Sequence, residues 1–284
     1  MPLTSTLDLV APAAAAGHGV GAFNVVQLEH AEALVAGAER AETPVILQIS
    51  ENTVRYHGAL APIGLATLAV ARAATVPVAV HLDHATRPDL VGEAVELGFP
   101  SVMFDASALE YAENEAATAD VVRHCHANGV VVEAELGEVG GKDGVHAPGA
   151  RTDPDDARRF VERTGVDMLA VAVGTSHAMV EQTATLDFAL IERLRAAVSV
   201  PLVLHGSSGV SDDDLGRAVR AGITKVNIAT RLNATFTTAA RTWLSDNPNG
   251  VDPRRYLGAA RDAVAGELPE ILRTLTTPAV EAPA

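Results

Sequence analysis

The segment VPVAVHLDHAT at residues 76–86 begins as an apolar run and ends in polar side chains that include Asp83 and His84. Two more histidines follow apolar runs later in the chain, His177 in AVAVGTSH and His205 in LVLHGSSG. Three neutral imidazoles that leave one position open are a ligand set of catalytic zinc. We therefore predict that these three histidines bind one metal ion; the alternative is that one or more of them bind only phosphate or the backbone.

Asp83 stands directly before the first predicted ligand, and His81 stands two residues before Asp83. Successive side chains of a strand point to opposite faces, so Asp83 is not expected to point the same way as His84. We interpret Asp83 as a carboxylate beside the metal that acts as a general acid and base. His81 is expected to be a supporting hydrogen-bond partner and not a fourth ligand.

Two further carboxylates, Asp105 in SVMFDAS and Glu135 in VVVEAELG, lie near the ends of apolar runs. Carboxylates beside a metal site commonly orient the ligating histidines through hydrogen bonds. We predict this role for both side chains, and a second metal position is the alternative.

Eight short β-rich runs alternate with longer segments that are rich in Ala, Leu, Glu and Arg. The runs occupy residues 21–25, 45–50, 78–85, 101–107, 130–137, 168–175, 201–208 and 225–230. Alternating strands and helices predict parallel pairing, and eight strands favour an α/β fold that closes as a (β/α)8 TIM barrel. An open Rossmann-like sheet is the alternative, but the glycines of GHGVGAF precede a strand instead of opening a helix.

The whole chain, residues 1–284, is expected to form a single domain. The barrel should occupy about residues 18–244, and extra C-terminal helices should extend it over about 245–275. Hydrophobic residues make up 48% of the chain, which is enough for a large core.

The formal charge of −15 argues against nucleic acid or an anionic membrane as a partner. The sequence has no apolar run of the roughly 20 residues that a membrane span needs. The first 39 residues carry no Lys or Arg, unlike a secretory signal. The single cysteine, Cys125, excludes an internal disulfide framework. We therefore expect a cytoplasmic enzyme.

The active site of a TIM barrel lies at the C-terminal ends of its strands. The unusual polar residues of this chain fall at those ends: Asn24, Ser50, Asp83, His84, Asp105, Glu135, Thr175, His177, His205 and Asn227. The predicted barrel would therefore bring them to one mouth.

Two turns follow the last two predicted strands, HGSSGVS at residues 205–211 and NIATR at 227–231. In barrels, the loops after strands seven and eight often bind phosphate through backbone N–H groups and a helix start. We expect a phosphate site here. The glycine-rich loop GEVGGKDGVHAPGA at residues 137–150 is a candidate lid, with a solvated connection as the alternative.

The motifs AFNV, HLDH, EAELG, AVAVGTSH, LVLHGSSG and KVNIAT resemble, in order and spacing, those of the class II, zinc-dependent fructose-bisphosphate and tagatose-bisphosphate aldolases. The resemblance covers about residues 3–275. It implies a lyase of carbohydrate metabolism that reversibly cleaves a ketose 1,6-bisphosphate to dihydroxyacetone phosphate and an aldehyde such as glyceraldehyde 3-phosphate.

The resemblance also implies roles for residues. One catalytic Zn²⁺ per subunit would bind the three predicted histidine ligands, with a monovalent cation as a further candidate. Asp83 would give a proton in condensation and take it in cleavage, and Asn227 would contact the enediolate. Asp105 and Glu135 resemble the family's alternative metal position. The predicted substrate-binding residues are Asn24, Ser50, Ala178, Gly206, Ser207, Ser208, Asn227, Ile228, Ala229, Thr230 and Arg254.

Arg254, in VDPRRYL between the two expected C-terminal helices, resembles an arginine that reaches the far phosphate from a neighbouring subunit. This implies a homodimer or a homotetramer. Ala178 stands where many relatives have glycine, and the loop carries Lys142 and Asp143 where fructose-type enzymes often have two carboxylates. NIAT resembles the tagatose branch and HGSSG the fructose branch, so the aldehyde half of the substrate stays open.

Three other functions compete with this interpretation: an aldolase for another ketose 1-phosphate, a metal-dependent TIM-barrel hydrolase, and a non-catalytic barrel that binds sugar phosphates. The metal sites of such hydrolases usually carry a carbamylated lysine or an HxH ligand pair on strand one, whereas strand one of this chain ends in Asn24 and HLDH is not an HxH motif. Retention of Asp83 beside all three histidines argues against a non-catalytic barrel. A Schiff base on Lys225, as in metal-independent aldolases, would have to displace the metal chemistry, so we reject it.

Overall fold

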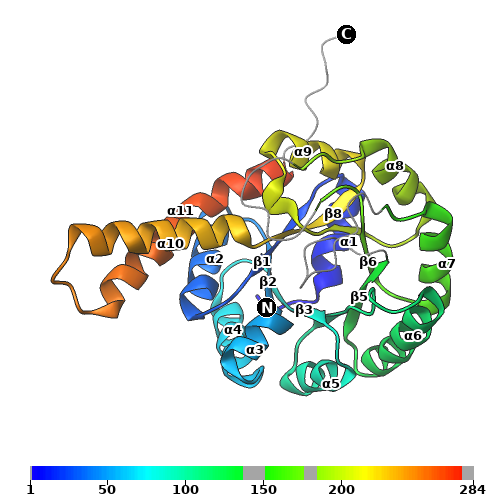
Figure 1. The fold of residues 1–284 in the computed structure, drawn as a ribbon, viewed down its shortest axis with the longest axis horizontal. Helices are drawn as coiled ribbons and strands as arrows, with labels where there is room; N and C mark the ends of the chain where they lie inside the picture. Colours follow the sequence, from blue (N-terminus) through cyan, green and yellow to red (C-terminus); the bar gives the residue numbers. More distant parts are fainter. Residues whose placement is uncertain (1, 137–150, 176–183, 277–284) are drawn as a thin grey trace, which may run out of the picture.

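The computed structural model describes residues 2–136, 151–175 and 184–276. Eight parallel strands pair in sequence order, and β1 pairs with β8 to close the barrel (Figure 1). The strands are β1 (Val20–Asn24), β2 (Val45–Ser50), β3 (Val78–Ala85), β4 (Ser101–Phe104), β5 (Val131–Leu136), β6 (Met168–Val171), β7 (Leu202–Leu204) and β8 (Ile223–Ile228). The predicted TIM barrel with extra helices is therefore confirmed.

Helices surround the barrel and continue beyond it. They are α1 (Thr6–Ala16), α2 (Leu28–Arg40), α3 (Glu51–His57), α4 (Ala61–Ala73), α5 (Pro88–Leu97), α6 (Tyr111–Ala127), α7 (Pro154–Thr164), α8 (Phe188–Ala197), α9 (Asp212–Ala221), α10 (Thr230–Asp246) and α11 (Pro253–Thr276), with a 3-10 turn, η1, at Ser207–Gly209. The local sequence explains where α7 begins and ends. Asp153 caps α7 through its side chain, Pro154 occupies the first turn, and Gly165 ends the helix in the left-handed conformation.

Helix α1 closes the barrel at the end opposite the candidate site. Its Leu9 and Val10 pack against small and medium apolar side chains that fill the barrel interior. Thr6 shares a hydrogen bond with Ser101, the first residue of β4, so α1 lies at the N-terminal ends of the strands. We did not predict this helix from the sequence.

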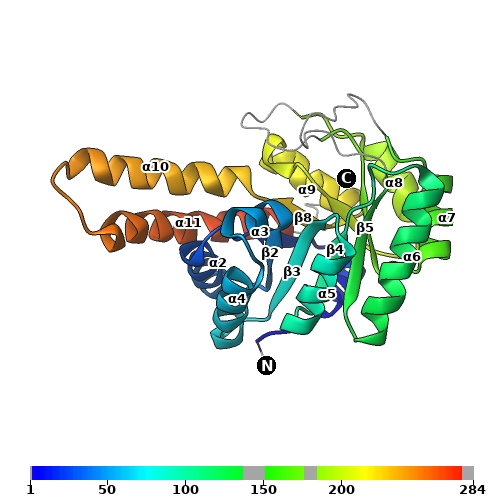
Figure 2. The ribbon, with the colours of Figure 1, turned by 60° about the horizontal axis from the view of Figure 1, so that its bottom comes forward.

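Helices α10 and α11 pair as a helical arm, residues 230–276, whose far end, at the connection between the two helices, extends away from the barrel (Figures 1 and 2). The two helices pack against each other, and α11 also packs against α2, α9 and β1. Arg254 is the second residue of α11. The expectation that it lies in the connection between the two C-terminal helices is therefore wrong, because α11 begins as early as Pro253.

Gly174, which follows β6, occupies a backbone conformation with φ of +120° that L residues rarely adopt. A Cβ atom here would collide with the backbone oxygen of Thr185. Gly129 also has a positive φ, +71°, but a Cβ atom added there would meet nothing within 4 Å.

We expect Gly129→Ala to cost about 1–2 kcal/mol of stability, the strain of left-handed backbone. Gly174→Ala should cost more, because it adds the collision with Thr185. Chemical denaturation of the two variants measures the difference, and equal losses would show that this contact relaxes without penalty.

None of the described helices combines the length and the apolar character that a membrane crossing requires.

Candidate metal centre and active site

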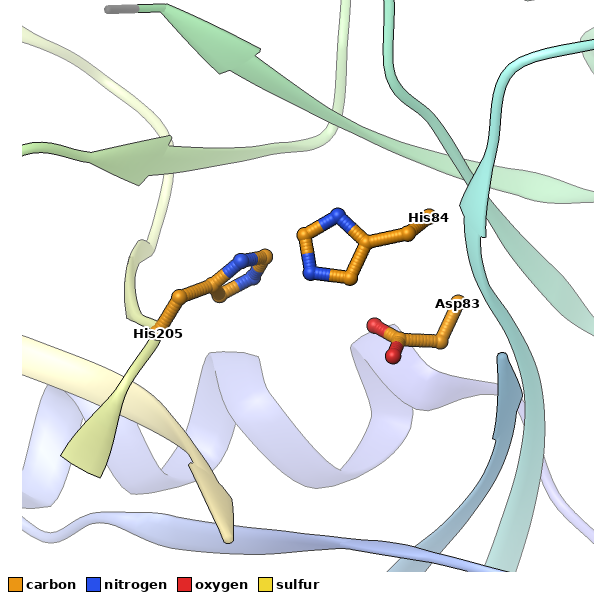
Figure 3. A group of neighbouring side chains, drawn as sticks. All are labelled: Asp83, His84 and His205. Carbon is orange, nitrogen blue, oxygen red and sulfur yellow. The ribbon is translucent and has the colours of Figure 1, made fainter. Parts of the chain in front are cut away.

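Three side chains converge at the C-terminal ends of the strands (Figure 3). Asp83 and His84 come from the end of β3, and His205 directly follows β7. One potential ligand atom from each lies within 4.8 Å of the other two. The two imidazole rings meet edge to face, with their centroids 4.6 Å apart. This spacing suits side chains that bind one ion between them.

His84 has an unusual backbone conformation that explains this convergence. Its φ is +51°, in the left-handed region, and the pairing of β3 with β4 shifts between Leu82 and Ala85. The irregularity breaks the alternation of a regular strand. The expectation that Asp83 and His84 could not point the same way is therefore wrong, because it assumed regular strand geometry.

Asp105 fixes the orientation of the His84 ring. His84 Nδ1 lies 2.8 Å from Asp105 Oδ2. The second oxygen, Oδ1, accepts from the Ser107 hydroxyl at 2.6 Å and from the Ser107 backbone N–H at 3.2 Å. A carboxylate accepts only, so Nδ1 carries the proton and Nε2 is the atom of His84 suited to an ion.

His205 lies between two buried carboxylates. Its Nε2 is 3.0 Å from Glu133 Oε1, and its Nδ1 is 3.3 Å from Glu135 Oε2. Burial alone would lower the pKa of His205, but the hydrogen bonds to both carboxylates outweigh it and raise this pKa to about 9. The surroundings of His205 therefore strongly favour positive charge, whether a proton or a metal ion supplies it.

Glu133 belongs to this site although it is not among the predicted site residues. The signal was present, because Glu133 and Glu135 stand two residues apart on β5 and so point to the same face of the strand. Both are fully buried. A pair of inward carboxylates on one barrel strand indicates a bound cation or a buried base nearby.

Asp83 on β3 is held by two asparagines, one at the end of β1 and one on β8. Asn24 Nδ2 lies 3.4 Å from its Oδ2, and Asn227 Nδ2 lies 3.4 Å from its Oδ1. Burial raises the pKa of Asp83, but its electrostatic interactions with His84, His205 and Lys225 more than offset this, and the net effect is a lowered pKa. Asp83 is therefore a carboxylate at neutral pH and is able to accept a proton.

His81 lies deeper in the barrel and is fully buried. Its Nδ1 lies 2.8 Å from Ser101 Oγ, and its Nε2 lies 3.6 Å from Glu133 Oε2. Burial lowers its pKa to about 3, so the ring is neutral. His81 is outside the group that surrounds Asp83 and His84.

The two predicted phosphate loops lie next to each other. Gly206 has φ of +67°, which turns the chain into η1. The Ser207 hydroxyl donates to the backbone oxygen of Asn227, and the backbone N–H of Arg231 lies 3.4 Å from Ser208 Oγ. The last strand position, Ile228, is buried; Ala229 is the N-cap residue of α10, and Thr230 is its first residue.

Other predicted residues lie in different surroundings. Ser50 caps α3, because its Oγ accepts from the backbone N–H of Thr53 at 3.2 Å. Arg254 has an 89% exposed side chain and forms an ion pair with Asp252. His177, Ala178 and Asp143 lie outside the described residues.

The described residues fit a zinc-type cation. They supply two imidazoles whose rings are oriented by carboxylates, together with Asp83 at the same point. Buried Asp83, Asp105, Glu133 and Glu135 give this region more negative than positive groups, and such an excess is stabilised by a divalent cation. A second group of potential ligands, His84 with Asp105 and Glu135, overlaps the first.

A closed eight-stranded barrel with imidazoles and carboxylates at its C-terminal mouth is the architecture of a metal-dependent barrel enzyme. The family model for class-II fructose-bisphosphate aldolase matches residues 4–278. The chain belongs to this family and is a class II aldolase.

Solved structures agree with this assignment. The YdjI aldolase from Escherichia coli K12 is 34% identical, with a TM-score of 0.84 over 96% of this chain and 97% of that one. An assigned fructose-1,6-biphosphate aldolase from Coccidioides immitis is 28% identical, with a TM-score of 0.84 and 95% of each chain covered. The fructose-bisphosphate aldolase of Campylobacter jejuni, 24% identical, shares the fold with a TM-score of 0.79 over 96% of this chain and 95% of that one.

Proposed function

We propose that this aldolase uses Zn²⁺ to cleave a ketose 1,6-bisphosphate of the fructose or tagatose type reversibly. The products are dihydroxyacetone phosphate and an aldehyde such as glyceraldehyde 3-phosphate. The observation that carries the proposal is the convergence of Asp83, His84 and His205 at the mouth of an aldolase barrel. Release of dihydroxyacetone phosphate from candidate substrates tests it.

The ion would be held by His84, His205 and, by resemblance, His177. When bound, Zn²⁺ supplies a Lewis acid that polarises the ketose carbonyl. Asp105 and Glu133 keep the rings of the two described ligands in place through their hydrogen bonds.

Asp83 is the proposed proton-transfer group. In cleavage its carboxylate would take the proton of the C4 hydroxyl as the C3–C4 bond breaks. C4 becomes the aldehyde carbon, and the electron pair of the broken bond stays with C3 as an enediolate, which a proton from solvent converts to dihydroxyacetone phosphate. In condensation C3 attacks the aldehyde, and Asp83 returns its proton to the C4 oxygen. The lowered pKa of Asp83 keeps it ionised at neutral pH, which the accepting role requires. Asn24 and Asn227 hold the carboxylate between them, and Asn227 would also contact the reacting end of the substrate.

Backbone N–H groups would bind the phosphate next to the ketose carbonyl. The candidates are those of the turn at residues 206–208 and of the start of α10 at 229–230. A helix N-terminus and a glycine turn both present N–H groups to an anion. Ala178 belongs to this proposed site by resemblance alone.

Arg254 tests whether the substrate has a second phosphate. If a neighbouring subunit receives this arginine, Arg254→Ala should raise KM for a ketose 1,6-bisphosphate by about 10- to 150-fold. KM for the matching ketose 1-phosphate should hardly change. Arg255→Ala, at the next position of the same helix, is the matched control.

Equal effects of Arg254→Ala on both substrates, or full activity of a monomer in sedimentation, would contradict the shared site. Such a result would favour the second candidate, an aldolase for another ketose 1-phosphate. One observation supports that candidate, because Arg254 is exposed on the helical arm and already paired with Asp252. Family membership argues against the metal-dependent hydrolase.

A further inference from the structure

Lys225 is a fully buried lysine inside the barrel, on β8. Its Nζ lies 2.8 Å from Glu133 Oε2, and the side chains of both residues are 0% exposed. Burying an ammonium and a carboxylate removes both from water, which is costly even for a pair. The buried pair of Lys225 and Glu133 therefore adds little net stability to the fold. Its position inside the barrel indicates a role in the site instead.

The same carboxylate also holds His205. Glu133 uses Oε2 for Lys225 and Oε1 for His205 Nε2, at 3.0 Å. Because a carboxylate only accepts, the proton on Nε2 is the one donated to Glu133. The nitrogen suited to an ion is then Nδ1, which faces Glu135 at 3.3 Å. Glu135 belongs to the acidic group around His84, so Nδ1 faces the metal centre.

Lys225 restricts the orientation of the Glu133 carboxylate. With one oxygen fixed by an ammonium from β8 and the other by the imidazole after β7, the carboxylate has a single orientation. The ammonium is also engaged with Glu133 in the barrel interior, which agrees with the rejection of Lys225 as a Schiff-base nucleophile.

We propose that Glu133 and Lys225 are positioning residues for the metal ligand His205. Glu133 orients the ring so that Nδ1 is the ligand atom, and Lys225 holds Glu133 in place. The inference rests on the proposed function, because it takes His205 to be a zinc ligand.

The test uses two measurements. Zinc affinity is measured by competition with a coloured chelator, and the stability of the metal-free protein is measured by thermal unfolding. Glu133→Gln should weaken zinc binding by about 10- to 100-fold, the usual effect of losing a carboxylate behind a ligating histidine. It should also destabilise the fold, because Lys225 loses its partner. Thr67→Ala, which removes a buried hydroxyl on α4 that bonds only within its own helix, is the control for destabilisation alone.

The double variant Glu133→Gln with Lys225→Met separates positioning from stability. Removing the unpaired ammonium should restore most of the unfolding temperature. Zinc affinity should stay at least about tenfold below that of the unmodified protein, because a neutral amide is a weaker acceptor than a carboxylate. The visible spectrum of the cobalt(II)-loaded double variant should differ from that of the unmodified protein, which reports the changed ligand.

The inference would be overturned if the double variant recovered its zinc affinity together with its stability. It would also be overturned if Thr67→Ala lost as much zinc affinity as Glu133→Gln. His205→Ala distinguishes this failure from failure of the proposed function. If the unmodified protein binds zinc no more tightly than His205→Ala, then His205 is not a ligand, and both proposals are wrong.

Discussion

Replacement of Asp83 by alanine is expected to reduce kcat by about 10²- to 10⁴-fold, the usual worth of a general acid–base group. Asp83 is buried, held by Asn24 and Asn227, and next to His84 and His205. Its loss removes the carboxylate that takes the hydroxyl proton, while the histidine ligands stay. Steady-state cleavage kinetics of the zinc-loaded variant measure the effect.

Asp83→Asn is the matched variant, because it keeps the size of the side chain and removes its charge. Zinc content must be measured for both variants, since a potential ligand atom of Asp83 lies within 4.8 Å of potential ligand atoms of His84 and His205. If a variant keeps its zinc but loses turnover, Asp83 acts in proton transfer. If a variant loses both zinc and turnover, Asp83 acts in metal binding. Near-normal turnover of a zinc-loaded variant would transfer the role to Asp143 or Glu135.

Removal of the metal ion is expected to reduce turnover by more than about 10³-fold, because a Lewis acid contributes several kcal/mol to charge stabilisation. Dialysis against a chelator followed by metal analysis and a cleavage assay gives the measurement. Added zinc should restore the activity, and the unfolding temperature should rise with it, because an ion that binds only the folded state stabilises it.

His84→Ala with zinc in excess is the control, since it should remain inactive when the unmodified protein recovers. Full activity of a protein shown to be free of metal would contradict the Lewis-acid mechanism. The buried excess of carboxylates around His84 and His205 would then need another explanation.

The barrel was predictable because its signals are local. Each strand is an apolar run bounded by turn residues, and the observed β2 and β3 coincide with the predicted ranges. The runs predicted at 101–107 and 201–208 end earlier, at Phe104 and Leu204, because the polar residues that follow leave the sheet. Helix α1 was not predicted because Pro12 interrupts its Ala-rich sequence and only the barrel interior gives Leu9 and Val10 a partner.

The sequence predicts several residues of the site but not how they are arranged in space. Strand-end position alone indicates His84 and His205, whereas the left-handed φ of His84 depends on the irregular pairing with β4. The spacing of Glu133 and Glu135 on β5 indicates an inward pair, but the partners of Glu133, His205 and Lys225, follow only from the packing of the barrel interior. The ligand roles and the role of Asp83 stay predictions until variants are measured.

We propose that this class II aldolase cleaves a phosphorylated ketose with a metal ion held by His84 and His205. The most direct test of this proposal is the release of dihydroxyacetone phosphate from fructose and tagatose 1,6-bisphosphates and the matching 1-phosphates, with and without chelator. We predict release from at least one of these substrates by the zinc-loaded protein, loss of release after chelation, and recovery when zinc is returned. No release from any of them by a folded, zinc-loaded protein, or release that chelation leaves unchanged, would contradict the account.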